Sequence, residues 1–297
     1  MTSPSETVHI LGAGSIGLMV AAYLSRISPV VLIRRPGCPE GELRFRLREA
    51  DTETAVTLPQ RPADTLEGPV RRMLLCTKAQ DALSAVEATA DKLAADAALL
   101  LMQNGMGSQE AIVRRFPALS VYAASTTEGA YRPEPDTVVH AGRGITRVGR
   151  LGGPNFDWTA LFRAAGFDAE TAEPIQWHLA NKLRVNALIN PLTVVYNCLN
   201  GELLERPDAV DRMRRLGEEA DRLLGAAGYA FDTSAFAEAV RVARATAANR
   251  SSMLQDARAG RTLEVDYITG YLLSLAGTHG LSVPAHQALY RRLLSRA

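Results

Sequence analysis

The six residues Gly12-Ala13-Gly14-Ser15-Ile16-Gly17 decide how this chain begins to fold. They directly follow an apolar run, Val8–Leu11, which predicts a strand, and they open a stretch, Ile16–Arg26, which predicts a helix. A glycine-rich turn between a strand and a helix is where dinucleotide-binding domains hold a pyrophosphate on backbone N–H groups. We therefore expect a dinucleotide site here, and a purely structural turn is the alternative.

The three glycines of this turn have separate tasks in such a site. Gly12 permits the tight turn, Gly14 lets the backbone approach the phosphates, and Gly17 lets the helix pack closely on the strand. A glycine pattern of this kind is a weak signal by itself. Its place between a strand and a helix is what favours the cofactor interpretation.

The residues after the second predicted strand, Val30–Ile33, indicate which dinucleotide is bound. Sites for NAD usually place an Asp or Glu there for the ribose 2′-hydroxyl. This chain has Arg34 and Arg35 instead, and two guanidiniums favour a 2′-phosphate. NADP(H) is thus the expected cofactor, and a solvated loop is the alternative explanation of the two arginines.

The rest of the first half alternates short apolar runs with helical stretches. Strands are predicted over Val30–Ile33, Arg72–Cys76 and Ala98–Met102, and helices over Ala79–Leu93 and Ser108–Phe116. Because each parallel connection needs a crossover, this pattern predicts an α/β fold with a Rossmann-type, doubly wound parallel sheet.

Two stretches of the first half fit this pattern less well. The stretch Thr126–Gly149 looks like extra strands that extend one edge of the sheet, with turns at Gly142 and Gly144. The stretch Cys38–Pro69 matches no motif. Its role and that of Arg35 stay unassigned at the level of the sequence.

After Pro174 the pattern changes to apolar residues at helical spacing. It predicts helices over Trp177–Ile189, Ala209–Ala226, Ala235–Leu254 and Val265–Ala276. The break falls near residues 168–175, where Glu173-Pro174 interrupts the chain. We therefore expect an NADP(H)-binding domain over residues 1–172 and an all-helical substrate and catalytic domain over residues 173–297.

The composition excludes several classes of protein. Of the 297 residues, 33 are Lys or Arg and 32 are Asp or Glu, and a net charge of +1 provides no field for nucleic acid or an anionic membrane. Cys38, Cys76 and Cys198 lack the spacing of a zinc site or a disulfide framework, so no metal is expected. No apolar run approaches the roughly 20 residues of a membrane helix, and no signal peptide is evident. A reduced, cytoplasmic protein is expected.

Two polar residues come shortly after predicted strands, at the carboxyl ends where cofactors bind. Lys78 comes after Arg72–Cys76, and Asn104 comes after Ala98–Met102. Ligands of doubly wound sheets lie beyond the carboxyl ends of the strands, so both residues are candidates for the cofactor crevice. A surface lysine and a turn-forming Asn-Gly pair are the alternatives.

Lys182, Asn186 and Asn190 stand four residues apart in the first predicted helix of the second half. This spacing puts them on one stripe, and two asparagines among apolar residues suggest a polar pocket. Pro191 disfavours helical backbone at Asn190, so we expect the helix to kink or end there. A solvent-facing stripe is the alternative.

A second polar cluster lies further along the chain. Asn249, Ser252 and Asp256 are expected on one helical stripe, where they could bind a small oxygen-rich ligand or serve as helix caps. Glu264 follows shortly after. Neither cluster has metal-ligand spacing, and no GxSxG motif appears, so hydrolases and metalloenzymes are disfavoured.

Together these motifs resemble the ketopantoate reductase (2-dehydropantoate 2-reductase) family, NADPH-dependent enzymes of pantothenate and coenzyme A synthesis. The matching pieces occur in family order along nearly the whole chain: Gly12–Gly17, Thr77-Lys78, Gln103–Gly107, Lys182–Thr193, Asn200–Leu203 and Ser251–Tyr267. The resemblance implies that ketopantoate is reduced to pantoate by hydride from NADPH, with Lys182 as proton donor to the keto oxygen. Glu264 would be the second catalytic residue, at the cofactor and lysine end of the site.

The resemblance also implies binding roles for other polar residues. For the substrate it implies Asn104, Asn186, Asn190, Asn200, Asn249 and Ser252. For the cofactor it implies the Gly12–Gly17 turn, Arg34, Lys78, Asn104 and Glu264. These roles are chemically coherent, because an ammonium stabilises the negative charge that hydride addition builds on a ketone oxygen and can then give up a proton.

Two other functions stay open from the sequence. A reductase of another branched 2-oxo acid would use the same Lys182 and cofactor site with a reshaped pocket. A non-catalytic NADP(H) sensor would have no need of Lys182 together with the asparagine stripe and Glu264. The helical half could form a homodimer through an apolar face or stay monomeric, and the expected partner is a small-molecule substrate.

Overall fold

The computed structural model describes residues 6–295 and divides the chain into two compact units. The sheet unit contains the chain up to Gln103 together with Ser108–Gln176. The helical unit contains Asn104–Gly107 together with the chain from Trp177 onward. The loop that carries Asn104 therefore belongs to the helical unit, although its sequence neighbours on both sides belong to the sheet unit.

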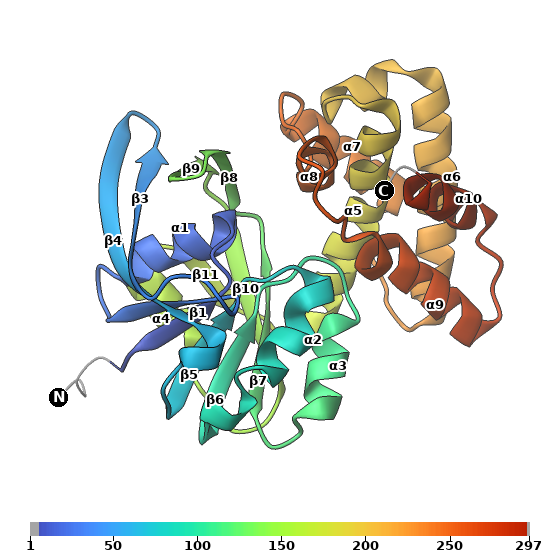
Figure 1. The fold of residues 1–297 in the computed structure, drawn as a ribbon. Coiled ribbons are helices and arrows are strands. Elements are labelled where there is room, and N and C mark those ends of the chain that lie inside the picture. The colour runs from blue at the N-terminus through green and yellow to red at the C-terminus, as the bar shows by residue number, and fades with distance from the viewer. Residues whose placement is uncertain (1–5, 296–297) are drawn as a thin grey trace. The chain divides into compact units, whose positions relative to one another are not determined.

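One sheet of 11 strands forms the sheet unit, in the order β11-β10-β7-β6-β5-β1-β2-β4-β3-β9-β8 (Figure 1). Its strands are β1 (Val8–Leu11), β2 (Val30–Arg34), β3 (Gly41–Glu49), β4 (Thr52–Pro62), β5 (Val70–Leu75), β6 (Leu93–Leu101), β7 (Ser120–Thr126), β8 (Gly129–Glu134), β9 (Thr137–Gly142), β10 (Ile145–Gly152) and β11 (Asp168–Thr171). Neighbouring strands from β7 to β4 in this order are all parallel. The expected doubly wound parallel sheet is confirmed.

Helices cover both faces of the sheet. They are α1 (Ser15–Leu24), α2 (Ala79–Glu87), α3 (Ser108–Arg115) and α4 (Trp158–Ala164), with 3-10 turns at Ala63–Thr65 and Ala90–Lys92. Alternate residues of the central strands enter different cores, since Ile10 and Leu32 pack with α1 whereas Leu11 and Ile33 pack with α2 and α3. Because both faces are buried, these strands are continuous apolar runs in the sequence.

β3 and β4 form a long antiparallel hairpin within Cys38–Pro69, the stretch that matched no motif. Its signal in the sequence is the alternation of Leu43, Phe45 and Leu47 with charged residues along β3. All three apolar side chains pack against the core that contains α1. The hairpin places β4 beside β2, and therefore beside the end of the strand that carries Arg34.

Two expectations for the first half are wrong. The strands from Thr126–Gly149 extend both edges of the sheet, because β8 and β9 lie at one end of the strand order and β10 lies near the other. The helix expected to reach Leu93 ends at Glu87. Leu93 already pairs with Val70 of β5, so the backbone there is used by the sheet.

The helical unit contains α5 (Ile175–Tyr196), whose first two residues belong to the sheet unit. Its other elements are η3 (Gly201–Glu205), α6 (Pro207–Ala226), α7 (Ala235–Ala245), α8 (Ser252–Arg258), the π-helical η4 (Asp266–Gly270), α9 (Tyr271–His279) and α10 (Pro284–Leu294). The single helix expected over Ala235–Leu254 is wrong, because a turn separates α7 from α8. Backbone carbonyls of Ala247 and Asn249 in this turn accept from the N–H groups of Gly201 and Asn200.

α5 does not end at Asn190 but continues through Pro191 to Tyr196. Pro191 has no N–H, so the helix loses one backbone hydrogen bond, to the carbonyl of Ala187. Leu188 and Leu192 on either side of the proline are fully buried. Burial of apolar side chains on this segment outweighs the cost of one missing hydrogen bond.

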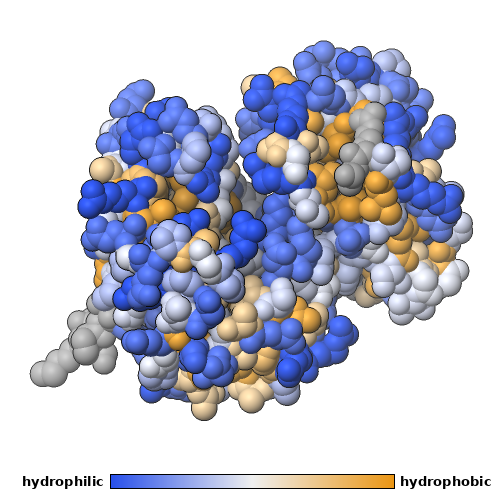
Figure 2. Space-filling model, in the orientation of Figure 1, coloured by the Kyte–Doolittle hydropathy of each residue, from blue (hydrophilic) through white to orange (hydrophobic). Residues whose placement is uncertain are grey.

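Polar residues cover most of the visible surface, and hydrophobic residues gather on the helical unit beside α10 (Figure 2). Leu294 of α10 is 49% exposed. Within residues 6–295, no helix combines the length and the apolar composition needed to cross a bilayer.

Candidate functional site

The glycine turn after β1 has the geometry of an anion cradle. Gly12 has φ of +111°, and a Cβ there would lie 2.7 Å from backbone atoms of Cys76 and Thr77. A Cβ on Gly17 would overlap the carbonyl oxygen of Gly12, whereas a Cβ on Gly14 would have a single neighbour within 4 Å among residues 6–295, at 3.9 Å. The N-terminus of α1 has no side-chain cap and no acidic residue in its first turn. The open side at Gly14 and the uncapped N–H groups fit a pyrophosphate.

Three buried side-chain oxygens near the ends of β5 and β6 have no hydrogen-bond partner within residues 6–295. They belong to Thr77, Gln80 and Gln103. Gln103 is held firmly, because its Nε2 donates to the carbonyls of Leu75 (3.0 Å) and Thr77 (3.3 Å). Lys78, the residue before α2, lies between Thr77 and Gln80 in the sequence and is half-buried. Since buried polar atoms are normally paired, these oxygens are suited to accept hydrogen bonds from a bound ligand.

Arg34 ends β2 and is fixed by a residue that sequence analysis missed. Its Nη1 donates to Oε1 of Gln60 at 3.0 Å. Gln60 lies on β4 and is only 4% exposed. Arg35 is exposed, so the two arginines have different environments. The alternation of β4 could have revealed a strand, but only the pairing of β4 with β2 shows that Gln60 meets Arg34.

In the helical unit, Lys182 of α5 donates from Nζ to Oδ1 of Asn104 at 2.9 Å. The loop that carries Asn104 is held against η4, because Met106 N–H donates to the carbonyl of Tyr267 at 2.9 Å. Gly105 has φ of +78°, and a Cβ there would overlap the same carbonyl group. Only glycine permits this approach. The structure therefore brings together two of the expected residues, 78 positions apart in the chain.

Lys182 has the protonation behaviour of a proton donor. Burial lowers its pKa to about 8, and the negative charge of Glu264 opposes part of this shift. Glu264 is only 9% exposed and precedes η4. An amine with a pKa near 8 is mostly protonated at neutral pH and can still release its proton. Lys182 can thus stabilise, and protonate, an oxygen that develops negative charge, while Glu264 favours the protonated lysine and Asn104 accepts one of its hydrogen bonds.

Asn186 and Asn190 lie one and two turns beyond Lys182 on α5, so the expected stripe is present. Asn186 is half-buried and Asn190 is 8% exposed. The carbonyl of Asn190 accepts from Thr193 Oγ1 at 2.7 Å, and that hydroxyl shares a 2.6 Å hydrogen bond with Ser251 Oγ. Sequence analysis missed this pair of buried hydroxyls. Ser251 is also the N-cap of α8, where its Oγ accepts from the N–H of Leu254 at 3.0 Å, and its contact with Thr193 depends on tertiary packing.

Asn200 is 7% exposed, and its Oδ1 is a further buried oxygen with no hydrogen-bond partner in the described part of the chain. Its Nδ2 donates to Thr246 Oγ1 at 2.9 Å, and its N–H donates to the carbonyl of Asn249 at 3.0 Å. Asn249, Ser252 and Asp256 do not form the expected single stripe, since Asn249 precedes α8. Asn249 and Ser252 are both exposed. Asn200 is therefore the better-buried ligand candidate of this region.

Two family models match the chain and together span most of it. The model described as "Ketopantoate reductase PanE/ApbA" matches residues 8–153, and the model described as "Ketopantoate reductase PanE/ApbA C terminal" matches residues 174–296. A 2-dehydropantoate 2-reductase of Yersinia pestis is 36% identical over 225 residues, 73% of this chain and 71% of that relative. A 2-dehydropantoate 2-reductase of Vibrio cholerae is 33% identical over 291 residues and covers 96% of each chain.

Solved structures with the same fold include two kinds of enzyme. A PanE/ApbA family ketopantoate reductase from Ralstonia eutropha JMP134 superposes with a TM-score of 0.86, at 27% identity over 98% of each chain. A D-mandelate dehydrogenase solved with NADH and anilino(oxo)acetate superposes with a TM-score of 0.87, at 21% identity over 98% of each chain. At that identity the second match shows a shared fold only.

Proposed function

The chain belongs to the ketopantoate reductase family, and on this premise we propose that it reduces 2-dehydropantoate (ketopantoate) to pantoate with NADPH. Bound NADPH would supply the hydride. The protein would bind both molecules, hold the ketone beside a proton donor and complete the reduction by protonating the oxygen.

The sheet unit supports the cofactor part of this proposal. The open cradle at Gly14 suits the pyrophosphate, and the guanidinium of Arg34, fixed by Gln60, suits the 2′-phosphate of NADPH. The buried oxygens of Thr77 and Gln103, which have no partner in the described part of the chain, suit hydroxyl or amide donors of the nucleotide. Lys78 stands at the same strand ends and would add a positive charge.

Lys182 would act on the keto oxygen. Its ammonium stabilises the negative charge that grows there as hydride adds to the carbonyl carbon, and it then transfers a proton from Nζ. Glu264 keeps the lysine protonated, and Asn104 accepts a hydrogen bond from Nζ and so limits its orientations. Lys182 and Glu264 are thus the proposed catalytic pair.

The substrate offers a carboxylate and a hydroxyl besides its ketone. Amide groups of Asn104, Asn186, Asn190 and Asn200 would bind these oxygens without adding a charge that cancels that of Lys182. The buried Oδ1 of Asn200 is suited to accept from the substrate hydroxyl. Asn249 and Ser252 are exposed and would contribute at the rim of the site.

The 2.9 Å bond between Lys182 and Asn104, beside Glu264, is the observation that carries the proposal. The test is the loss of NADPH absorbance with ketopantoate in wild type, in Lys182→Ala and in Lys92→Ala. Lys92 is the matched control, because it is a surface lysine paired with Asp91 at 2.6 Å. We expect kcat to fall by about 10²–10⁴-fold in Lys182→Ala only, with NADPH affinity retained.

Other outcomes would point elsewhere. A wild-type protein that binds NADPH but leaves ketopantoate untouched contradicts the substrate, and a panel of branched 2-oxo acids would then identify another reductase or leave an NADP(H) sensor. Equal activity of Lys182→Ala and wild type would contradict the role of Lys182 as proton donor.

We extend the proposal to a homodimer in the cytoplasm. A solved ketopantoate reductase from Staphylococcus aureus is described as dimeric, and an apolar patch beside α10 is visible here (Figure 2). The three cysteines are all unpaired thiols, which fits a reducing compartment. Light scattering of the purified protein tests the homodimer, and fractionation of cells tests the location in the cytoplasm.

A further inference from the structure

The β8–β9 hairpin brings an arginine to the glycine turn that no sequence motif indicated. Both strands of the hairpin contact α1, which starts at the glycine turn (Figure 1). Ala130 of β8 packs against the same core as Ala13 and Ile16. Two residues further along, Nη1 of Arg132 donates to the carbonyl oxygen of Ala13 at 3.3 Å. The guanidinium therefore contacts the Gly12–Gly17 turn at Ala13, between Gly12 and Gly14.

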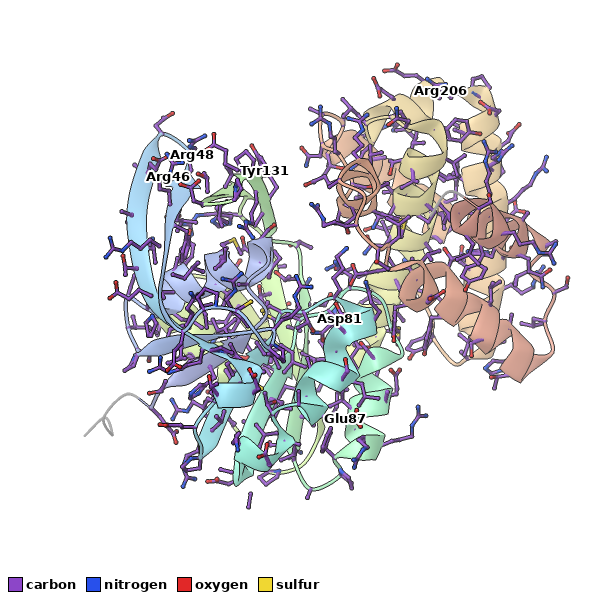
Figure 3. All side chains as sticks on the ribbon, in the orientation of Figure 1. Arg46, Arg48, Asp81, Glu87, Tyr131 and Arg206 are labelled. Atoms are coloured by element: carbon purple, nitrogen blue, oxygen red, sulfur yellow. The ribbon has the colours of Figure 1, made fainter. Side chains whose placement is uncertain are left out.

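A second hydrogen bond holds the guanidinium of Arg132 in place, and the carboxylates next to it in the chain are bound by another arginine. Nη2 of Arg132 donates to the carbonyl of Pro135, in the turn that joins β8 to β9. Two carboxylates beside Pro135, those of Glu134 at the end of β8 and Asp136 in the turn, are bound by Arg46 of β3 at 2.9 and 3.1 Å. Figure 3 labels Arg46 and also Tyr131, the neighbour of Arg132 on β8. Arg46 thus compensates the negative charges of Glu134 and Asp136.

We propose that Arg132 is a ligand of the cofactor pyrophosphate, contributed by the β8–β9 hairpin. This inference rests on the proposed function, since it needs a dinucleotide on the glycine turn. The N–H groups of this turn would hold the pyrophosphate, and its negative charge would attract the guanidinium that contacts Ala13 of the same turn. The site would then have two arginines with separate tasks, Arg34 at the 2′-phosphate and Arg132 at the pyrophosphate.

Two other roles for Arg132 predict different results. As a structural strut it would only tie the hairpin to the glycine turn by its hydrogen bond to Ala13. As a second 2′-phosphate ligand it would affect NADPH and leave NADH unchanged. Arg132→Gln keeps a donor for the carbonyl but removes the charge, whereas Arg132→Lys keeps the charge, so the pair separates a strut from an ionic ligand.

The experiment is calorimetric titration of the full chain with NADPH and, separately, with NADH. Arg150→Ala is the matched control, because Arg150 is also an exposed strand arginine whose Nη1 donates to a backbone carbonyl, that of Gly153, at 3.1 Å. We expect Arg132→Ala and Arg132→Gln to weaken both dinucleotides by the same factor, about 10- to 100-fold, as for loss of a charge-assisted hydrogen bond. Arg132→Lys should recover part of the affinity, and Arg150→Ala should match wild type.

The following results would overturn the inference. If Arg132→Gln binds both dinucleotides like wild type, Arg132 is a strut, even where Arg132→Ala lowers the melting temperature. If only NADPH is weakened, Arg132 serves the 2′-phosphate. If wild type binds neither dinucleotide, the proposed cofactor fails and this inference fails with it, whereas normal wild-type binding with unaffected variants overturns this inference alone.

Discussion

The glycine turn of the sheet unit and the Lys182 site of the helical unit are built in opposite ways. The turn consists of backbone, and its defining residues, Gly12, Gly14 and Gly17, lie within six positions of one another. The lysine site consists of side chains from Asn104, Lys182 and Glu264, which come from three distant parts of the chain. A backbone site depends on local conformation, and a side-chain site depends on tertiary packing and burial. Each kind should therefore fail in its own way when a single residue is changed.

The largest effect is expected from Gly12→Ala. A Cβ at this residue would lie 2.7 Å from the backbone of Cys76 and Thr77, at a φ of +111°. Backbone atoms of a central strand end cannot move easily, so the turn itself must distort. We expect NADPH affinity to fall more than about 100-fold, with a lower melting temperature, because overlap and left-handed strain add. Calorimetric titration and thermal unfolding measure the two effects.

Gly166→Ala is the control for this prediction. Gly166 has φ of +96°, but a Cβ there has no neighbour within 4 Å in the described structure. It should cost about 1–2 kcal/mol of stability from backbone strain and leave NADPH affinity unchanged. Equal NADPH affinities of Gly12→Ala and Gly166→Ala would contradict the prediction that Gly12 shapes the cofactor cradle.

A smaller effect concerns the pH dependence of the lysine site. The reaction needs protonated Lys182, whose pKa is about 8, so kcat/KM should be constant below that pH and fall tenfold per unit above it. Glu264 raises this pKa, so Glu264→Gln should move the break in the profile to lower pH. Activity at pH 8 should then fall more than activity at pH 6. Initial rates from about pH 5.5 to about pH 10, a range on both sides of the pKa of Lys182, measure both profiles.

Glu238→Gln is the control for the pH profile. Glu238 is a carboxylate of the same unit, but its partner is Arg241 at 2.6 Å. Removal of the Glu238 charge should leave the pH above which kcat/KM falls the same as in wild type. A profile of Glu264→Gln that overlies that of wild type would contradict the electrostatic link between Glu264 and Lys182.

The smallest effect is expected from Gln60→Ala. Loss of the 3.0 Å bond to Arg34 frees the guanidinium without removing its charge, so NADPH should bind about fivefold more weakly. NADH, which lacks the 2′-phosphate, should bind as it does to wild type. The ratio of the two dissociation constants isolates the effect, and an equal loss for both dinucleotides would show that Gln60 supports the sheet rather than Arg34.

The success of sequence analysis differed between elements for physical reasons. The strands β1 and β2 and the parallel sheet were predicted well, because burial on both faces makes continuous apolar runs. The β3–β4 hairpin was missed although Leu43, Phe45 and Leu47 alternate, because charged residues between them look like a solvated loop. The helix over Ala235–Leu254 was predicted as one, since the turn near Asn249 is held by hydrogen bonds to a distant segment.

The sequence by itself determined the glycine turn, the alternation of strands and helices, the polar stripe on α5 and the family resemblance. Each of these depends on residues that are near one another in the chain, where backbone geometry and periodicity act directly. Only the tertiary structure decided that Asn104 belongs with Lys182, that Gln60 fixes Arg34 and that Arg132 reaches the glycine turn. Such contacts join residues far apart in the chain, and which distant side chains meet is set by strand order, register and burial.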